Sequence, residues 1–239
     1  MTSTENEPVS DTKTTIGTKV LKAVTGATQN FKPLSNIHEH VCGFHFYAHD
    51  MTRQLEVHHY CSHLNNDVRQ CVLYDSNEAN ARLIGVEYII SPKLFMGLPE
   101  DEKKYWHSHV YEVKSGLLTA PMASAIPKSA AEQAENKIME DLIDTYGKTW
   151  FFWQVDRGDP LPYGPPQLVM VPLDDSQVDM SKVLARDEKF KVSTADKRKV
   201  REKIFPKYKL DPAADHWATR ADGQAYQTDV VLVPQKKKT

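Results

Sequence analysis

Histidines are the residues of this chain most able to do chemistry. The sequence contains ten, and nine of them lie between His38 and His109. Neutral imidazole is the commonest metal ligand in proteins and the usual acid or base near neutral pH. The concentration therefore favours a metal site or acid–base catalysis in this stretch. The alternative is that the imidazoles only satisfy buried polar neighbours, as any buried polar side chain must.

The pair His107-Ser-His109 has the spacing most typical of metal ligands, because residues two apart in an extended chain project to the same side. Two histidines and a carboxylate with open positions can bind Fe, Zn or Mn and activate water or oxygen. Glu112 follows the pair, but in an unbroken strand it would face away from His109; Glu87 is the alternative carboxylate. We expect a mononuclear divalent metal site in which one of these carboxylates completes the ligands or acts as general base.

Strand alternation sorts the histidines of the earlier segments. His58 and His59 are neighbours, so a regular strand turns them to opposite faces. The row that contains His59 is the more apolar, which favours His59 as the inward ligand. We expect His40 and His58 to bind the ion or to orient its ligands, with His58 also a candidate catalytic residue.

Short runs of β-branched and aromatic residues predict the strands that would position these side chains. They cover residues 40–48, 54–63, 69–74, 82–91, 108–114, 116–121, 149–155 and 167–171. Periodicity and capping signals predict helices over 16–27, 99–106, from the capping box at Ser129 to a glycine cap at Gly147, and from Ser193 to Pro206. We therefore expect an α+β fold, a mostly antiparallel sheet with flanking helices.

Composition divides the chain into four segments. We expect a disordered N-terminus (1–14), a short amphipathic helix (15–30), a core domain (31–173) and a polar C-terminal extension (174–239). The amphipathic helix either binds a membrane surface or a partner, or packs on its own domain.

Charge and cysteine content exclude several classes of protein. The 30 basic and 32 acidic residues leave a net charge of −2, so we expect no nucleic-acid binding by bulk charge. Three cysteines without C-x-x-C spacing argue against a secreted disulfide scaffold, and we interpret them as buried apolar side chains. No apolar run approaches the ~20 residues of a membrane helix, so we expect a cytoplasmic protein without a transmembrane segment.

Several long blocks resemble the oil-body-associated protein family over about residues 35–172. They include HEHVCGFHFYAHDMTRQLEVHHYCSHLN (38–65), ARLIGVEYIIS (81–91), WHSHVYEVKSG (106–116) and WQVDRGDPLPYG (153–164). The resemblance implies a soluble protein found with plant seed oil bodies, with relatives in fungi and bacteria and no settled activity. Among the candidate site residues, His40, His58, His59, His107, His109 and Glu112 match the family's motif positions. Because the chain has no long apolar hairpin, its contact with a lipid droplet would be peripheral, through the helix near 16–26.

Three functions remain open from the sequence. The first is a metal-dependent oxygenase or hydrolase acting on a small-molecule or lipid-like substrate. The second is a non-catalytic protein of the lipid-droplet surface, or a scaffold, with structural histidines. The third is acid–base catalysis by paired histidines without a metal. The sequence leaves the substrate, the metal and the oligomeric state undetermined.

Overall fold

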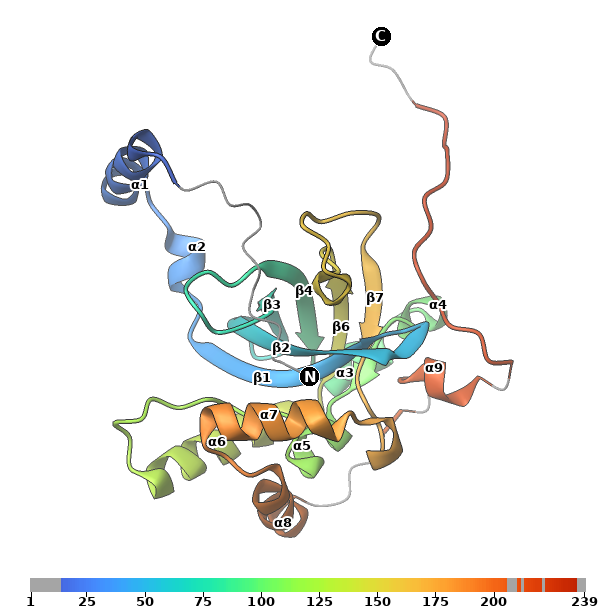
Figure 1. Cartoon of the computed structure of the whole chain (residues 1–239). Helices are drawn as coiled ribbons and strands as arrows, with labels where there is room; N and C mark the ends of the chain where they lie inside the picture. Colours follow the sequence, from blue (N-terminus) through green and yellow to red (C-terminus); the bar gives the residue numbers. More distant parts are fainter. Residues whose placement is uncertain (1–13, 206–209, 212, 221, 236–239) are drawn as a thin grey trace.

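The computed structural model describes residues 14–205, 210–211, 213–220 and 222–235 (Figure 1). The segment expected to be disordered, 1–14, lies outside the described residues except for Thr14.

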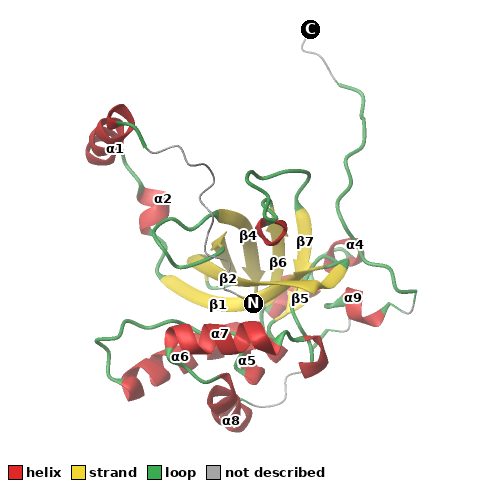
Figure 2. Cartoon of the chain, viewed as in Figure 1, coloured by secondary structure: helices red, strands yellow, loops and turns green. Residues whose placement is uncertain are grey.

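The strands form one antiparallel sheet that closes on itself (Figure 2). The strand order is β4-β3-β2-β1-β7-β6-β5, and β4 pairs additionally with β6. The first six positions in this order therefore make a closed barrel, and β5 is added beside β6. The strands are β1 (Glu39–Tyr47), β2 (Asp50–Asn65), β3 (Val68–Tyr74), β4 (Leu83–Ile90), β5 (His107–Ser108), β6 (Tyr146–Phe151) and β7 (Gln167–Met170).

The closed barrel corrects the expected architecture. An α+β fold with a mostly antiparallel sheet and flanking helices is wrong, because residues 85–90 of β4 pair with residues 146–151 of β6 and complete a ring. Alternation of apolar and polar residues indicates which face of a strand is buried. It does not indicate which strands pair with each other. The pattern of apolar and polar residues therefore could not predict that β4 pairs with β6 and closes the barrel.

Helices cover one side of the barrel and extend from another. In Figure 1, α5, α6, α7 and α8 gather beneath β1, whereas α1 and α2 stand away from the barrel. The helices are α1 (Ile16–Thr28), α2 (Lys32–Ser35), α3 (Pro92–Met96), α4 (Glu100–Lys103), α5 (Val110–Ser115), α6 (Lys128–Leu142), α7 (Met180–Phe190), α8 (Thr194–Ile204) and α9 (His216–Thr219), with short 3-10 turns η1 (Val155–Arg157) and η2 (Asp175–Gln177).

The segment after β5 is the clearest local difference from the sequence prediction. The strand expected over 108–114 is wrong, because α5 occupies residues 110–115. Glu112 lies in the first turn of α5, where a carboxylate suits the helix dipole, and Gly116 ends the helix with a left-handed φ of 81°. Likewise, the expected capping box at Ser129 is not formed, since α6 begins after Pro127.

The barrel interior is the main hydrophobic core. Inward residues of β1 and β2 pack against β3, β6, β7 and α6. The buried set includes Val41, Tyr47, Leu55, Val57, Leu73, Phe151, Val169, Met139 and Leu142. Outside the barrel, Phe44 of β1 packs against Val183 of α7. The two faces of β1 are therefore both covered, one by the core and one by a helix.

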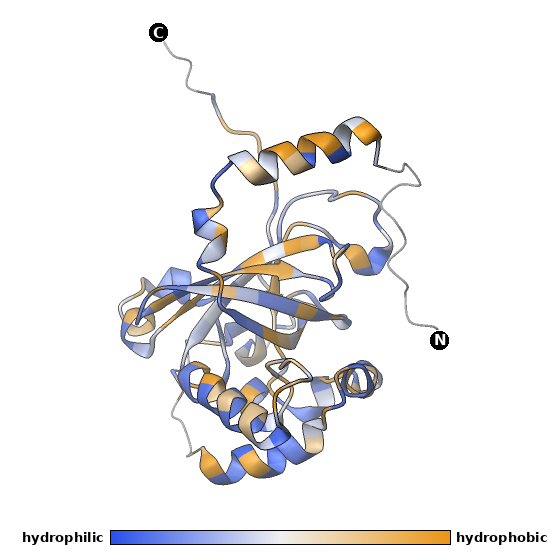
Figure 3. Ribbon diagram, turned by 90° about the vertical axis from the view of Figure 1, so that its left-hand side faces the viewer, coloured by the Kyte–Doolittle hydropathy of each residue, from blue (hydrophilic) through white to orange (hydrophobic). Residues whose placement is uncertain are grey.

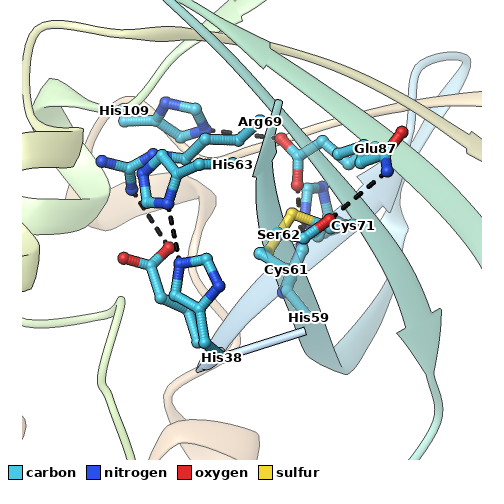
Figure 4. Close-up of a disulfide and its surroundings, with 12 residues drawn as sticks. His38, His59, Cys61, Ser62, His63, Arg69, Cys71, Glu87 and His109 are labelled. Atoms are coloured by element: carbon cyan, nitrogen blue, oxygen red, sulfur yellow. Dashed lines mark hydrogen bonds and ion pairs between the residues drawn. A yellow bond between two sulfur atoms is a disulfide. The ribbon is translucent and has the colours of Figure 1, made fainter. Parts of the chain in front are cut away.

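Cys61 and Cys71 form a disulfide between β2 and β3, where they lie directly opposite each other with a Cα–Cα distance of 4.1 Å (Figure 4). They are therefore a cross-link rather than the separate buried thiols expected from the sequence. Cys42, on the outer face of β1, is free and buried.

Buried arginines join the C-terminal helices to α5 and α6. Arg201 of α8 donates from Nη1 to the carbonyls of Val113 (3.0 Å) and Leu118 (2.7 Å), and from Nη2 to Glu135 Oε1 (3.0 Å). Arg186 of α7 is equally buried and donates to the Leu117 carbonyl at 2.8 Å. These contacts tie α7 and α8 to α5, to the segment that follows it and to α6.

Candidate metal centre

Four histidines surround Glu87 inside the barrel. His45 comes from β1, His59 from β2, Glu87 from β4 and His107 from β5, and His109 is the residue that precedes α5. None of these five residues is more than 3% exposed. Distant parts of the chain therefore converge on one buried carboxylate.

The two oxygens of Glu87 face different histidines. Oε2 lies 3.1 Å from His59 Nε2, which in turn lies 3.0 Å from His45 Nε2. Oε1 lies 3.3 Å from His107 Nε2 and 3.4 Å from His109 Nε2. The labelled side chains of His59, Glu87 and His109 can be followed in Figure 4, beside the disulfide.

The His109 ring is held by the strand-entry segment before β6. Its Nδ1 lies 3.1 Å from the Thr145 carbonyl oxygen and 2.9 Å from Thr145 Oγ1, and that hydroxyl donates to the Leu142 carbonyl at 2.6 Å. Both Thr145 atoms must therefore accept, so Nδ1 carries the proton. In the neutral ring, Nε2 then presents a lone pair to the Glu87 carboxylate. Two acceptors face each other there.

The protonation states suit a cation. Burial alone raises the pKa of Glu87, but the contacts of its oxygens with the surrounding imidazoles hold it well below its usual value. Burial lowers the pKa of His109, and it lowers the pKa of His45 well below the usual value. Glu87 is thus held as a carboxylate beside His45 and His109, whose lowered pKa values favour the neutral imidazole, the form in which histidine binds metals.

Several buried nitrogens of the cluster lack partners. His45 Nδ1, His59 Nδ1 and both ring nitrogens of His107 have no hydrogen bond within the described part of the chain; the approach of His107 Nε2 to Glu87 lacks hydrogen-bond geometry. Buried polar atoms are rarely left unsatisfied. The side chains alone therefore do not complete this site.

Glu112 joins the site because α5 is helical. Three residues after His109, it lies on the same side of the chain and lines a cavity with His45, His59, Glu87 and His109. Burial and the charge of Glu87 raise the pKa of Glu112 well above its usual value. The cavity has a volume of about 10 Å³, room for about one water molecule beside the cluster.

Gly147 of β6 leaves space for the cluster. A Cβ at this position would overlap Glu87 Oε1 and lie 2.6 Å from His107 Nε2. The sequence suggested Gly147 as a helix cap; its position in a strand directly opposite His107 explains the glycine instead.

Two candidate ligands lie outside the barrel. His40 and His58 occupy the outer face, where His40 Nε2 is 2.9 Å from His58 Nδ1 and His58 Nε2 is 3.0 Å from Glu56 Oε1. The His58 ring packs against Phe190 of α7. The structure therefore brings together His59, His107, His109, Glu87 and Glu112, and separates His40 and His58 from them.

His45 is the cluster member that the sequence analysis did not select. It lies two residues from Tyr47 and four from Val41, both buried in the barrel core. Alternation along β1 therefore predicts its inward direction by the argument that selected His59.

The fold and the cluster define a closed antiparallel barrel with a buried histidine–carboxylate centre. A family model described as "Protein of unknown function (DUF1264)" matches residues 31–205. The chain is 43% identical to oil body-associated protein 1A of Zea mays over 229 residues, covering 95% of this chain and 91% of the relative. It is 46% identical to oil body-associated protein 1B of Arabidopsis thaliana over 191 residues, covering 80% and 76% respectively. The chain belongs to this family.

No solved structure matches the fold. Within the described residues, no helix has both the length and the apolar character needed to cross a membrane.

Proposed function

We propose that the barrel binds a divalent transition-metal ion at Glu87, His107 and His109. The orientation of the His109 ring carries this proposal, because its Nε2 lone pair and the Glu87 carboxylate are both acceptors at 3.4 Å. A cation between them would convert this repulsion into coordination. The hydrogen bonds of Nδ1 to Thr145 are the kind that orient metal-ligating histidines.

The ligands present limit the choice of ion. Imidazole suits Zn and Fe, and a carboxylate is also accepted by Mn, so these three remain the candidates. The ligand atoms of Glu87, His107 and His109 lie within 4.8 Å of one another. That spacing is compatible with ligand distances of roughly 2.0–2.2 Å to a shared ion.

The size of the cavity favours a bound ion over catalysis on an organic substrate. At about 10 Å³, the space beside the cluster admits about one water molecule. An oxygenase or hydrolase would need room for its substrate next to the ion. We therefore propose metal binding itself, in a structural or storage role, as the function of this site.

Elemental analysis of the untagged full-length chain, purified without chelator, tests the proposal. The wild type should carry bound Zn, Fe or Mn, and Glu87→Gln should lose it, because the amide keeps the shape of the side chain and removes its charge. The outer-face variant His58→Gln is the matched control and should retain the metal. Equal metal content in wild type and Glu87→Gln would overturn the proposal.

A second candidate function is attachment to oil-droplet surfaces, which the names of the relatives suggest for this chain too. Helix α1 has no buried residue, and Ile16, Val20 and Leu21 are 82%, 58% and 60% exposed. Figure 3 shows this helix apart from the barrel, with hydrophobic residues along it.

The charge around α1 fits a phospholipid surface. Residues 14–38 contain lysines 19, 22 and 32 and no acidic residue. Basic residues beside an apolar helix face favour the interface of anionic lipids. We propose that α1 lies on the phospholipid layer of the droplet while the barrel remains in water.

Flotation with artificial phospholipid-coated oil droplets tests this attachment. Val20→Asp/Val24→Asp should abolish flotation by placing charge on the apolar face. Thr18→Asp/Thr25→Asp adds the same charge to the opposite face and should reduce flotation far less. If both double variants float like the wild type, α1 is not the attachment.

A further inference from the structure

We infer that the barrel centre holds two metal ions bridged by Glu87; this inference rests on the proposed metal binding and extends it. Two groups of potential ligands share that one residue. The first is His45, His59 and Glu87, and the second is Glu87, His107 and His109. All of these side chains are buried.

The ligand spacing within each group fits an ion of its own. In the first group, the Nε2 atoms of His45 and His59 are 3.0 Å apart, and His59 Nε2 is 3.1 Å from Glu87 Oε2. In the second, Glu87 Oε1 is 3.3 Å from His107 Nε2 and 3.4 Å from His109 Nε2. Tetrahedral ligands roughly 2.0–2.1 Å from one ion lie about 3.3 Å from each other. Both groups therefore have the separations of a coordination shell.

The orientation of Glu87 argues for two positions rather than one. Oε2 faces His59, which contacts His45, and Oε1 faces His107 and His109. A carboxylate that bridges two ions has this arrangement. Such ions lie about 3.5–4 Å apart in two-metal sites. Glu112, which lines the same cavity, places a second carboxyl group beside the cluster.

Two other histidine groups must be kept apart from this assignment. His38, Glu39 and His63 form a surface group, and Cys42, Glu56 and His58 form a group on the outer face of the barrel. Either could contribute an ion to a measured total. The positive charges of Arg186 and Lys189 interact with both Cys42 and Glu56. They would also repel a cation bound at the outer-face group, which disfavours a metal ion there.

Metal stoichiometry tests the inference. The full-length chain with His38→Ala/His63→Ala, produced in cells supplied with zinc, should contain two ions per chain. Adding His45→Gln should leave one, adding His107→Gln should leave one, and adding Glu87→Gln should leave none. Adding His58→Gln should leave two. Circular dichroism and the melting temperature verify that each variant is folded.

The outcomes separate the inference from the proposed function. One ion per chain that His45→Gln does not remove would overturn the ion at His45 and His59 and leave the proposed ion at Glu87, His107 and His109 intact. No ion at all would overturn both. A loss on His58→Gln would assign the second ion to the outer face and overturn the bridge.

A spectroscopic measurement does not depend on the variants. Protein produced with manganese should give an exchange-coupled electron paramagnetic resonance spectrum, since ions sharing a carboxylate interact magnetically. A spectrum that shows only isolated Mn²⁺ would overturn the inference that Glu87 bridges two ions.

Discussion

At the scale of single residues, the cluster depends on one carboxylate that stays charged inside an apolar barrel. Burial opposes ionisation, yet the imidazoles of His107, His109 and His59 hold the pKa of Glu87 low. Isolated buried charges are costly unless they are paired. Glu87 is therefore the residue on which the charge of the whole site depends.

Gly147→Ala should damage this site without removing a ligand. The new methyl group would overlap Glu87 Oε1 and approach His107 Nε2, so the side chains must shift. We expect loss of bound metal and a destabilisation of about 1–3 kcal/mol, the usual cost of overpacking, measured by elemental analysis and urea unfolding. Gly26→Ala is the control, since a Cβ there meets nothing within 4 Å. Unchanged metal content and stability in Gly147→Ala would contradict the role given to this glycine.

The feature of the site that the sequence predicted best is the side of the strand to which each histidine points. Alternation correctly turned His59 inward and His58 outward, and the same rule applied to β1 would have found His45. Which inward residues meet depends on the curvature of the barrel, which no local pattern records. Gly147 could not be found either, because its reason is a neighbour, Glu87, that lies 60 positions earlier in the chain.

At the scale of elements, one helix decides whether the second carboxyl group reaches the site. As a strand, 108–114 would turn Glu112 away from His109; as α5, it brings the two together. The segment is rich in β-branched and aromatic residues, which favoured a strand in the sequence analysis. Its helical form is set by tertiary contacts, including the hydrogen bond of Arg201 to the Val113 carbonyl.

Arg201→Ala should destabilise the protein strongly. It would remove three buried hydrogen bonds and leave Glu135 without its ion pair to Arg201. Breaking a buried pair costs about 3–5 kcal/mol. Because Glu135 keeps its ion pair with Lys197, we expect the lower end of this range, which chemical denaturation would measure. Arg198→Ala is a control on the same helix. The Arg198 side chain is 33% exposed, pairs with the exposed Asp175 and makes only long hydrogen bonds to the Ser115 carbonyl and Tyr111, and exposed pairs contribute about 0–1 kcal/mol. Equal effects of the two substitutions would show that Arg201 does not anchor α8.

At the scale of the whole molecule, the sequence predicted most of the strands and helices. It did not predict that the strands close into a barrel. The strands over 40–48, 54–63, 69–74 and 82–91 appear within a few residues of their expected positions. Helix α7 was not predicted, because its exposed residues are as polar as the rest of the C-terminal extension. Only Val183 and Arg186 of this helix are buried. The pairing of β4 with β6 joins elements more than 50 residues apart, beyond the reach of local periodicity.

Stability should fall as the pH falls from about 6.5 to 4. Burial, with the nearby His58, lowers the pKa of His40 to about 4 in the folded chain, from 6.5. Between these values the unfolded chain binds more protons, so acidification favours unfolding. Glu112 acts in the opposite sense above its ordinary pKa of 4.5, since its folded pKa is raised.

Comparing wild type with His40→Gln isolates the contribution of His40. Urea midpoints measured at intervals between pH 7.5 and 4 should decline less steeply in the variant. Parallel curves for the two proteins would mean that His40 does not take part in the pH response.

The burial of the cluster has a consequence for how any ion arrives and leaves. Every residue of the cluster is at most 3% exposed, and the barrel around it is a closed ring. Exchange of a metal ion bound there as proposed would therefore require the structure around the cluster to open locally, so we expect the ion to be acquired as the chain folds and afterwards retained kinetically. A chelator in solution would remove it at the rate of those rare openings, however strong the chelator's own affinity.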